Sequence, residues 1–231
     1  MTPCCQDRCC GTNLFFSKMS AYFDRQYRKH GLEKIQRHLL EGVRRDLSQS
    51  ASLLDIGCGV GALHLALLRE GARSAVGVEI SEGMLDRARR HASELGLQNQ
   101  THYIRGDFVE CQAEIHASDV SMLDKVVCCY PDLDALLVAT TQKTNCLLAI
   151  THPRNNLLAA TLFKVHIAVA RVVGLSFHPF WHDWERMHGG IESQGFDLIH
   201  LRSTPVWQAR VYRKRQPSPP RTVPSEDTNL R

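Results

Sequence analysis

Short apolar runs alternate with segments of helical spacing through most of the chain. The first run, Leu53–Ile56, leads into the glycine-rich turn Gly57–Gly61, and residues 62–69 then have the spacing of a helix. Apolar runs of this length are typical of buried strands, and glycines let the backbone turn sharply and approach a ligand closely. We therefore predict a strand, a tight turn and a helix whose N-terminus faces a ligand.

Four more apolar runs follow, with helical segments between most of them, and we interpret each as a strand. They are residues 75–79, 102–105, 119–123 and 146–150. Repeated strand–helix units favour parallel strands joined by right-handed crossovers, and ligands then bind at the carboxyl ends of the strands. The pattern therefore predicts an α/β fold.

Residues 15–46 also have a helical pattern, and Gly31 is expected to separate two helices within this segment. The earlier helix is unusually aromatic for a surface element, since it contains Phe15, Phe16 and Phe23. Two interpretations remain open: this helix packs on the sheet, or it closes over the bound ligand.

A further helix is predicted over residues 157–173, where apolar side chains cover more than one stripe. We expect an ordinary core helix. In a second interpretation, one face borders a substrate pocket whose mouth is closed by Phe177–His182, which would favour an apolar or aromatic substrate. Association with a membrane surface is a third interpretation, because Lys164 and Arg171 accompany the apolar face.

Composition fits one ordinary soluble domain, since 43% of the 231 residues are hydrophobic and 23% are charged. The net charge of +4 is mild and much of it falls in the C-terminal tail, so we expect no nucleic-acid partner. We expect no stable membrane insertion, because the most apolar run contains Lys164, His166 and Arg171. Five of the nine cysteines lie in or beside apolar segments, which indicates a reducing, cytoplasmic setting.

The N-terminus contains two adjacent cysteine pairs, Cys4-Cys5 and Cys9-Cys10. A thiol pair or soft-metal clip is one interpretation, but structural metal sites normally use Cys-x-x-Cys spacing, and we expect no metal site. The chain is thus expected to comprise a Cys-rich flexible N-terminus (1–13), an N-terminal helical cap (14–48), a cofactor-binding core (49–213) and a disordered tail rich in proline (214–231).

Each of the first three predicted strands has an acidic residue near or just beyond its end. Asp55 directly precedes the glycine turn, Glu79 ends the second strand, and Asp107 with Phe108 follows the third. A carboxylate about twenty residues past such a turn accepts hydrogen bonds from two ribose hydroxyls. Because residues 57–62 also satisfy G-x-G-x-x-A, the dinucleotide fingerprint, a nicotinamide-dependent oxidoreductase is an alternative.

With these motifs, the sequence resembles the class I S-adenosylmethionine-dependent methyltransferases over residues 30–213. Residues 55–61 look like the first motif of that family, D-x-G-x-G-x-G, with every fixed position filled. Residues 119–131 are similar to its fourth motif, and residues 195–212 resemble its last helix, sixth strand and reversed seventh strand. The resemblance implies a Rossmann-like, seven-stranded, mostly parallel sheet with an antiparallel last strand and helices on both faces.

Within the family, the chain is similar to bacterial small-molecule enzymes of the magnesium-protoporphyrin O-methyltransferase type. The similarity rests on Cys128–Asp132, on His152–Arg154 and on the apolar helix that follows. The implied partner is a small-molecule methyl acceptor, and the oligomeric state is left open.

The resemblance implies that S-adenosylmethionine is the cofactor. The glycine turn and Asp55 would hold its methionine end, Glu79 its ribose, and Asp107 with Phe108 its adenine. A helix cap is the alternative role for Asp124. The expected cofactor-binding residues are Asp55, Gly57, Cys58, Gly59, Gly61, Glu79, Ile80, Asp107, Phe108, Leu123 and Asp124.

A sulfonium is an activated methyl donor, so in-line positioning is expected to supply most of the rate. A base is needed only if the acceptor carries a proton at neutral pH. The candidates are Tyr130, His152 and His178, with a structural role as the alternative for each histidine. A non-catalytic cofactor-binding module, whose N-terminal cysteines sense metal or oxidant, is a second alternative function.

Overall fold

The computed structural model describes residues 7–172, 177 and 179–216, with side chains from residue 11 onward. Its strands form one seven-stranded sheet in the order β3-β2-β1-β4-β5-β7-β6. The strands are β1 (Ser52–Ile56), β2 (Ser74–Glu79), β3 (Thr101–Arg105), β4 (Ser118–Asp124), β5 (Thr144–Pro153), β6 (Phe196–Ser203) and β7 (Trp207–Lys214). The helices are α1 (Asp7–His30), α2 (Lys34–Arg44), α3 (Ala62–Arg69), α4 (Glu82–Glu94), α5 (Phe108–Cys111), α6 (Leu133–Gln142), α7 (Leu157–Val172) and α8 (Trp184–Ser193), with 3-10 turns η1 (Gln98–Gln100) and η2 (Gln112–Glu114).

Strand β1 lies inside the sheet and pairs in parallel with both β2 and β4. The chain runs from β1 outward to β2 and β3, then crosses back to β4 on the other side of β1. Strand β7 pairs antiparallel with both β5 and β6. The predicted mostly parallel sheet with an antiparallel last strand is therefore confirmed. The reversal of strand order between β1 and β4 is where α/β sheets bind ligands.

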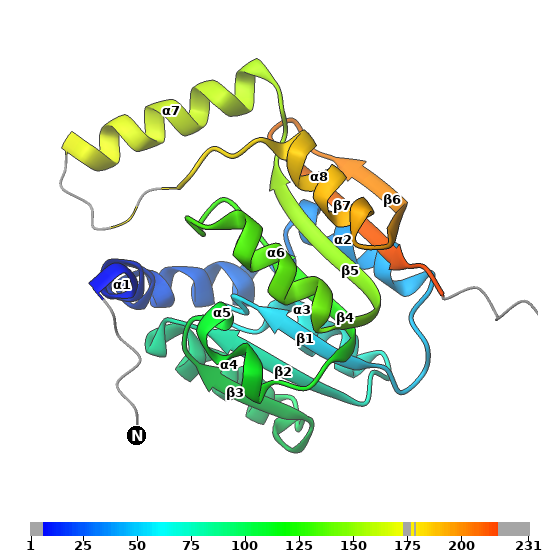
Figure 1. Cartoon of the computed structure of the whole chain (residues 1–231). Coiled ribbons are helices and arrows are strands. Elements are labelled where there is room, and N and C mark those ends of the chain that lie inside the picture. The colour runs from blue at the N-terminus through cyan, green and yellow to red at the C-terminus, as the bar shows by residue number, and fades with distance from the viewer. Residues whose placement is uncertain (1–6, 173–176, 178, 217–231) are drawn as a thin grey trace, which may run out of the picture.

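Helices cover both faces of the sheet (Figure 1). Helices α2, α3 and α4 pack with one face, where Leu53 of β1 is buried. Helices α5, α6 and α8 pack with the other face, where the neighbouring Leu54 is buried. Because successive side chains of a strand point to opposite faces, a run of consecutive apolar residues is required wherever both faces are covered.

The aromatic helix α1 lies beside α4, near the carboxyl ends of the strands. Phe16, Phe23 and Tyr27 pack against a small buried cluster that includes Val60 and Met84. Gly31 has a φ of 66° and separates α1 from α2, as expected. Helix α1 begins at Asp7, inside the stretch expected to form a separate flexible N-terminus, and the domain boundaries stay predictions. Residues 1–6 and 217–231, which contain Cys4, Cys5 and most of the expected tail, lie outside the described residues.

Helix α7 is not the core helix that its composition predicts. Only Ala159 and Ala170 of its residues are buried, and Figure 1 shows the helix standing apart from the sheet. Leu157 and Val172 are 87% and 89% exposed. Within the described part of the chain, no helix is both long enough and apolar enough to cross a bilayer.

Two buried histidines lie side by side where α8 packs on β5. The rings of His152 on β5 and His188 on α8 are 4.8 Å apart between centroids, and His152 also packs on Trp184. The His152 Nδ1–H donates to the carbonyl of Pro153 at 2.7 Å, and His188 Nδ1 lies 2.7 Å from the Tyr212 hydroxyl. Burial lowers the pKa of His152 to about 4 and that of His188 to about 3. Both rings are therefore neutral at pH 7.

These histidines predict a loss of stability in mild acid. In the unfolded chain each ring binds a proton near pH 6.5, whereas in the folded protein it does so only below about pH 4. The two neutral rings therefore make their full contribution to the free energy of unfolding above pH 6.5, and this contribution falls as the pH decreases. We expect each ring to cost roughly 2 kcal/mol of unfolding free energy between pH 7 and pH 5. Urea unfolding measured across this range, with His152→Gln and with exposed His102→Gln as control, tests this. An equal pH dependence in wild type and His152→Gln would contradict it.

Candidate functional site

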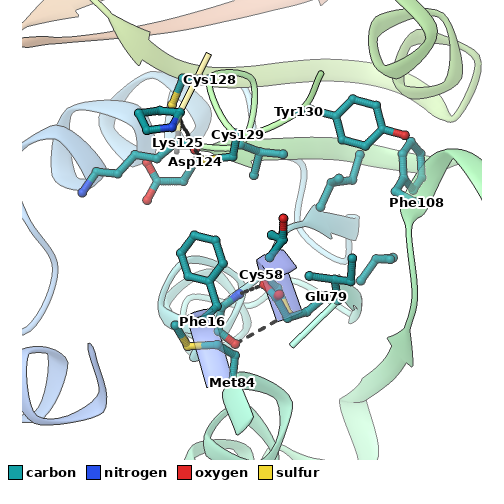
Figure 2. Close-up of a pocket in the computed structure, with 18 of the residues that line it drawn as sticks. Phe16, Cys58, Glu79, Met84, Phe108, Asp124, Lys125, Cys128, Cys129 and Tyr130 are labelled. Carbon is teal, nitrogen blue, oxygen red and sulfur yellow. Dashed lines mark hydrogen bonds between the residues drawn. The ribbon is translucent and has the colours of Figure 1, made fainter. Parts of the chain in front are cut away.

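One cavity of about 940 Å³ lies at the carboxyl ends of β1, β2 and β4, under the aromatic side of α1. Figure 2 shows its walls: Cys58, Glu79 and Met84 on one side face the segment of Asp124, Lys125 and the two cysteines that follow on the other. A cavity of this size suits a nucleoside-bearing cofactor together with a small second ligand.

The glycine turn forms the floor of the cavity through left-handed backbone conformations that favour glycine. Gly57 and Gly59 have φ angles of 66° and 53°. A Cβ at Gly57 would lie 2.5 Å from a methyl group of Val126, whereas a Cβ at Gly59 would meet nothing within 4 Å. The open space beside Gly59 is what a cradle for a ligand requires. Gly61, with a φ of 86°, does not line the cavity and instead precedes the first turn of α3.

Asp55 is held from behind by a chain of buried side chains. Its Oδ2 lies 2.7 Å from Nδ1 of His64 on α3, and Nε2 of His64 lies 3.0 Å from the Tyr103 hydroxyl. The Tyr103 hydroxyl donates in turn to the carbonyl of Ala88 on α4. The carboxyl group of Asp55, which lines the cavity, is therefore fixed in orientation by residues of α3, β3 and α4.

Glu79 ends β2 and is held by backbone donors. Its Oε2 accepts from the N–H of Gly59 at 3.0 Å, and its Oε1 accepts from the N–H of Ser81 at 2.9 Å. Burial raises the pKa of Glu79, while the hydrogen bonds from these N–H groups lower it. Each carboxylate oxygen has two lone pairs, so Glu79 keeps the capacity to accept from two ligand hydroxyls.

Asp107 binds the Tyr130 hydroxyl, which donates to its two carboxylate oxygens at 2.9 and 3.1 Å. Oδ1 of Asp107 also accepts from the N–H of Val109 and caps the short helix α5. Figure 2 shows the Tyr130 ring next to Phe108. The hydroxyl of Tyr130, expected as a base, is thus directed at the acid expected to contact adenine.

Asp124, at the end of β4, is half-buried and lines the same cavity. Its Oδ1 accepts from the Thr151 hydroxyl at 2.5 Å, and its Oδ2 accepts from the side-chain amide of Gln36 at 2.7 Å. Burial raises the pKa of Asp124, and the ammonium group of Lys125 opposes this effect. Lys125 has a φ of 60° and pairs with Glu33 of the α2 N-terminus. Asp124 therefore has side-chain partners from both β5 and the helical cap.

Three cysteines also line the cavity. The Sγ atoms of Cys128 and Cys129 are 3.9 Å apart, and both thiols donate to the carbonyl of Lys125. Burial raises the pKa of Cys58 well above its ordinary value, and the adjoining Cys128 thiol together with burial does the same for Cys129. These two groups are therefore neutral thiols at pH 7. Across the residues that the structure describes, no three His, Cys, Asp or Glu side chains are placed to hold a metal ion.

The remaining wall of the cavity is apolar and aromatic. It is formed by α1, by α7, by the segment after α7 and by β7. The side chains that contribute are Phe15, Phe16, Leu162, Phe163, His166, Phe177, Pro179 and Trp207. Of the two interpretations of α1, closing over the ligand is the one that its position favours.

Most of the expected site residues come together at this cavity, and the structure places the others elsewhere. Leu123 is buried in the core next to Asp124, because successive residues of β4 point to opposite sides. His152 is a core residue between Trp184 and His188, and we no longer propose it as a base. His178 lies outside the described residues. Those that line the cavity are Asp55, Gly57, Cys58, Gly59, Glu79, Ile80, Asp107, Phe108, Asp124 and Tyr130.

Gln36, Lys125 and His166 line the cavity without having been expected there. The spacing Glu33-x-x-Gln36 resembles a capping box, and the Gln36 amide oxygen does accept from the Glu33 N–H at 2.8 Å. That signal indicates a helix start, and nothing in it indicates the bond from the same amide to Asp124. The sequence indicates Lys125 as a cavity residue only through its position next to Asp124, which was expected there.

The comparisons with known proteins agree with this geometry. A family model described as a methyltransferase domain matches residues 53–144. A ubiquinone biosynthesis O-methyltransferase from Methylobacterium nodulans is 31% identical over 181 residues, which cover 72% of this chain and 68% of that protein. A protein of the same description from Actinobacillus pleuropneumoniae is 34% identical over 94 residues, 37% of this chain and 40% of the relative.

Among solved structures, the magnesium protoporphyrin IX methyltransferase of Synechocystis PCC 6803 with bound SAH (S-adenosylhomocysteine) has a TM-score of 0.65. The two chains are 19% identical, and the match covers 88% of this chain and 98% of that one, so it shows a shared fold. The comparisons support neither a nicotinamide-dependent oxidoreductase nor a non-catalytic thiol-sensing module.

The arrangement around Asp55 predicts a specific loss of ligand affinity. We expect Asp55→Asn to weaken SAH binding about tenfold to a hundredfold, because hydrogen bonds to a charged group contribute about 1.5–3 kcal/mol. Isothermal titration measures this, and Asp86→Asn, an exposed acid on α4, is the matched control. A folded Asp55→Asn protein that binds SAH as tightly as the wild type would disprove the assignment.

Proposed function

The chain belongs to the class I S-adenosylmethionine-dependent methyltransferases, and on that premise we propose that it transfers the methyl group to an oxygen of a small apolar or aromatic acceptor. The observation that carries the proposal is the placement of three acids, Asp55, Glu79 and Asp107, in one cavity. The wall that α1, α7 and β7 add to this cavity is largely apolar. The names of the similar ubiquinone biosynthesis enzymes support an oxygen acceptor.

The residues of the cavity fit S-adenosylmethionine by the chemistry of their polar groups. The α-ammonium, the two ribose hydroxyls and the adenine amine of the cofactor are all hydrogen-bond donors, and a carboxylate is an acceptor. We assign Asp55 to the ammonium, Glu79 to the ribose and Asp107 to the adenine amine. When bound, the cofactor supplies a methyl group on a positively charged sulfur, and the protein's task is to align the acceptor with it.

The acceptor pocket is assigned to the apolar wall. Phe163, Phe177 and Trp207 present aromatic surface, and α1 contributes Phe15 and Phe16. Such a wall excludes water and orients a planar or aliphatic molecule by shape. The fit supports an acceptor that is largely apolar and carries one reactive oxygen.

We assign the proton-accepting role to Asp124. The carboxyl group faces the cavity at the end of β4, and burial raises its pKa towards the range in which a base is effective. The hydrogen bonds from Thr151 and Gln36 fix its orientation. Tyr130 is assigned instead to holding Asp107, because its hydroxyl donates to both carboxylate oxygens.

The proposal includes a cytoplasmic location and the division of the chain into a helical cap (14–48) and a cofactor-binding core (49–213). The thiols of Cys58, Cys128, Cys129 and Cys146 support a reducing location. Support for the division comes from α1, which packs over the turn that follows β1 and over the starts of α3 and α4.

Cofactor choice is tested by titrating the full chain with SAH and, in parallel, with NADH. We expect a single SAH site and no heat of binding from NADH. A folded protein that binds NADH but not SAH would end the proposal.

Replacement of Asp124 separates the role of a base from that of a cofactor ligand. We expect Asp124→Asn to lower kcat for a phenolic acceptor at least a hundredfold, since general bases contribute about 10²–10⁴-fold, while the Kd for SAH changes little. Transfer of a labelled methyl group to alkylphenols across a pH series measures the first quantity, and titration measures the second. If SAH binding were lost and kcat at saturation kept, Asp124 would be a cofactor ligand instead.

The placement of Tyr130 predicts the opposite pattern. We expect Tyr130→Phe to change the Kd for SAH several-fold, because Asp107 loses a hydrogen-bond donor, and to leave the pH dependence of kcat unchanged. Tyr22→Phe, at an exposed tyrosine of α1 that does not line the cavity, is the control. A shifted pH profile in Tyr130→Phe would restore the tyrosine as the base.

A further inference from the structure

The outer face of α7 is continuously apolar and exposed. Leu158, Leu162, Val165, Val169 and Val172 recur at steps of four and three residues, which places them on one side of a helix. Each is between 48% and 89% exposed. An adjoining side of the helix contains the two buried alanines and Phe163, which lines the cavity together with Leu162 at the edge of the apolar face. The amphipathic order is thus the reverse of that in an ordinary surface helix, whose polar side faces solvent.

The charges of α7 have one sign. Lys164 and Arg171, seven residues apart, lie together on the polar side of the helix, away from the apolar face, and the helix contains no Asp or Glu. Trp181, 38% exposed, packs edge-on against Phe163 with ring centroids 5.6 Å apart. An exposed apolar face, with cations on the polar side of the same helix, is the composition of helices that lie in the interface of anionic bilayers.

A second copy of the chain fits this face less well. Steps of four and three residues also occur in coiled coils, where charged residues beside the seam pair with opposite charges on the partner helix. Two copies of α7 would form no pair of opposite charges beside the seam, because the helix contains no Asp or Glu.

We propose that α7 docks the enzyme on the surface of an anionic lipid bilayer, with its apolar face in the headgroup region and Lys164 and Arg171 at the phosphates. The helix lies in the interface without spanning it. Each cation near such a surface adds to binding, and the apolar side chains add the burial of their exposed area.

The same helix connects the membrane to the cavity. Leu162, Phe163 and His166 of α7 line the cavity, so an acceptor dissolved in the bilayer would enter the pocket beside the docked helix. This last step rests on the proposed function, whereas the docking does not.

Sedimentation with lipid vesicles tests the docking. The full chain is mixed with vesicles of phosphatidylcholine alone or of phosphatidylcholine with phosphatidylglycerol. We expect at least tenfold stronger binding to the anionic vesicles, weakened by salt. Val165→Glu/Val169→Glu and Lys164→Gln/Arg171→Gln should each lower binding on the order of tenfold or more. The matched control is Val138→Glu, because Val138 on α6 is a similarly exposed valine at 45%, and it should bind as the wild type does.

Titration with SAH checks that each variant is folded, and it separates the two proposals. If the wild type binds vesicles but not SAH, the docking proposal holds and the proposed function is wrong. If it binds SAH but not vesicles, the docking proposal is wrong and the proposed function holds. Full vesicle binding by Val165→Glu/Val169→Glu would overturn the role of α7. A wild-type dimer in analytical ultracentrifugation that this variant abolishes, with no vesicle binding by either, would make the face a contact between copies.

Discussion

Four of the carboxyl groups that line the cavity, those at the carboxyl ends of β1 to β4, are the constraint on which the rest of the structure depends. Burial disfavours each negative charge, and charges of like sign also disfavour one another. The fold answers with a fixed donor or partner for each: His64 for Asp55, backbone N–H groups for Glu79, Tyr130 for Asp107, and Thr151 with Gln36 for Asp124. These partners belong to several of the helices, strands and turns around the cavity. The orientation of the four acids therefore depends on the packing of those elements.

The sequence predicts well those parts of the fold in which the local backbone conformation and the tertiary packing require the same residue type. Leu53 and Leu54 must both be apolar because both faces of β1 are covered, and Gly57 must lack a side chain because a Cβ would clash with Val126. Both requirements can be recognised in a short stretch of sequence.

Other features depend on contacts that no local pattern contains. His152 was expected at a strand end, but β5 continues to Pro153 because β7 pairs with it through His152 and Gln208, and the ring stays in the core. Gln36 meets Asp124 across 88 positions of the chain. The local sequence also does not predict the exposure of α7, since a helix buried in a protein core and a helix that meets another apolar surface have the same apolar composition.

Because so little of α7 is buried, α3 and α7 differ in how freely their sequences can change. Helix α3 contributes Leu63, Leu65, Leu67 and Leu68 to the core, so almost any change there disturbs packing. Helix α7 contributes two alanines, and its replacement would cost the core little. A lineage, or a designer, can therefore exchange this one segment to redirect the enzyme to another acceptor or another surface, while the cofactor machinery on the far side of the cavity is inherited unchanged.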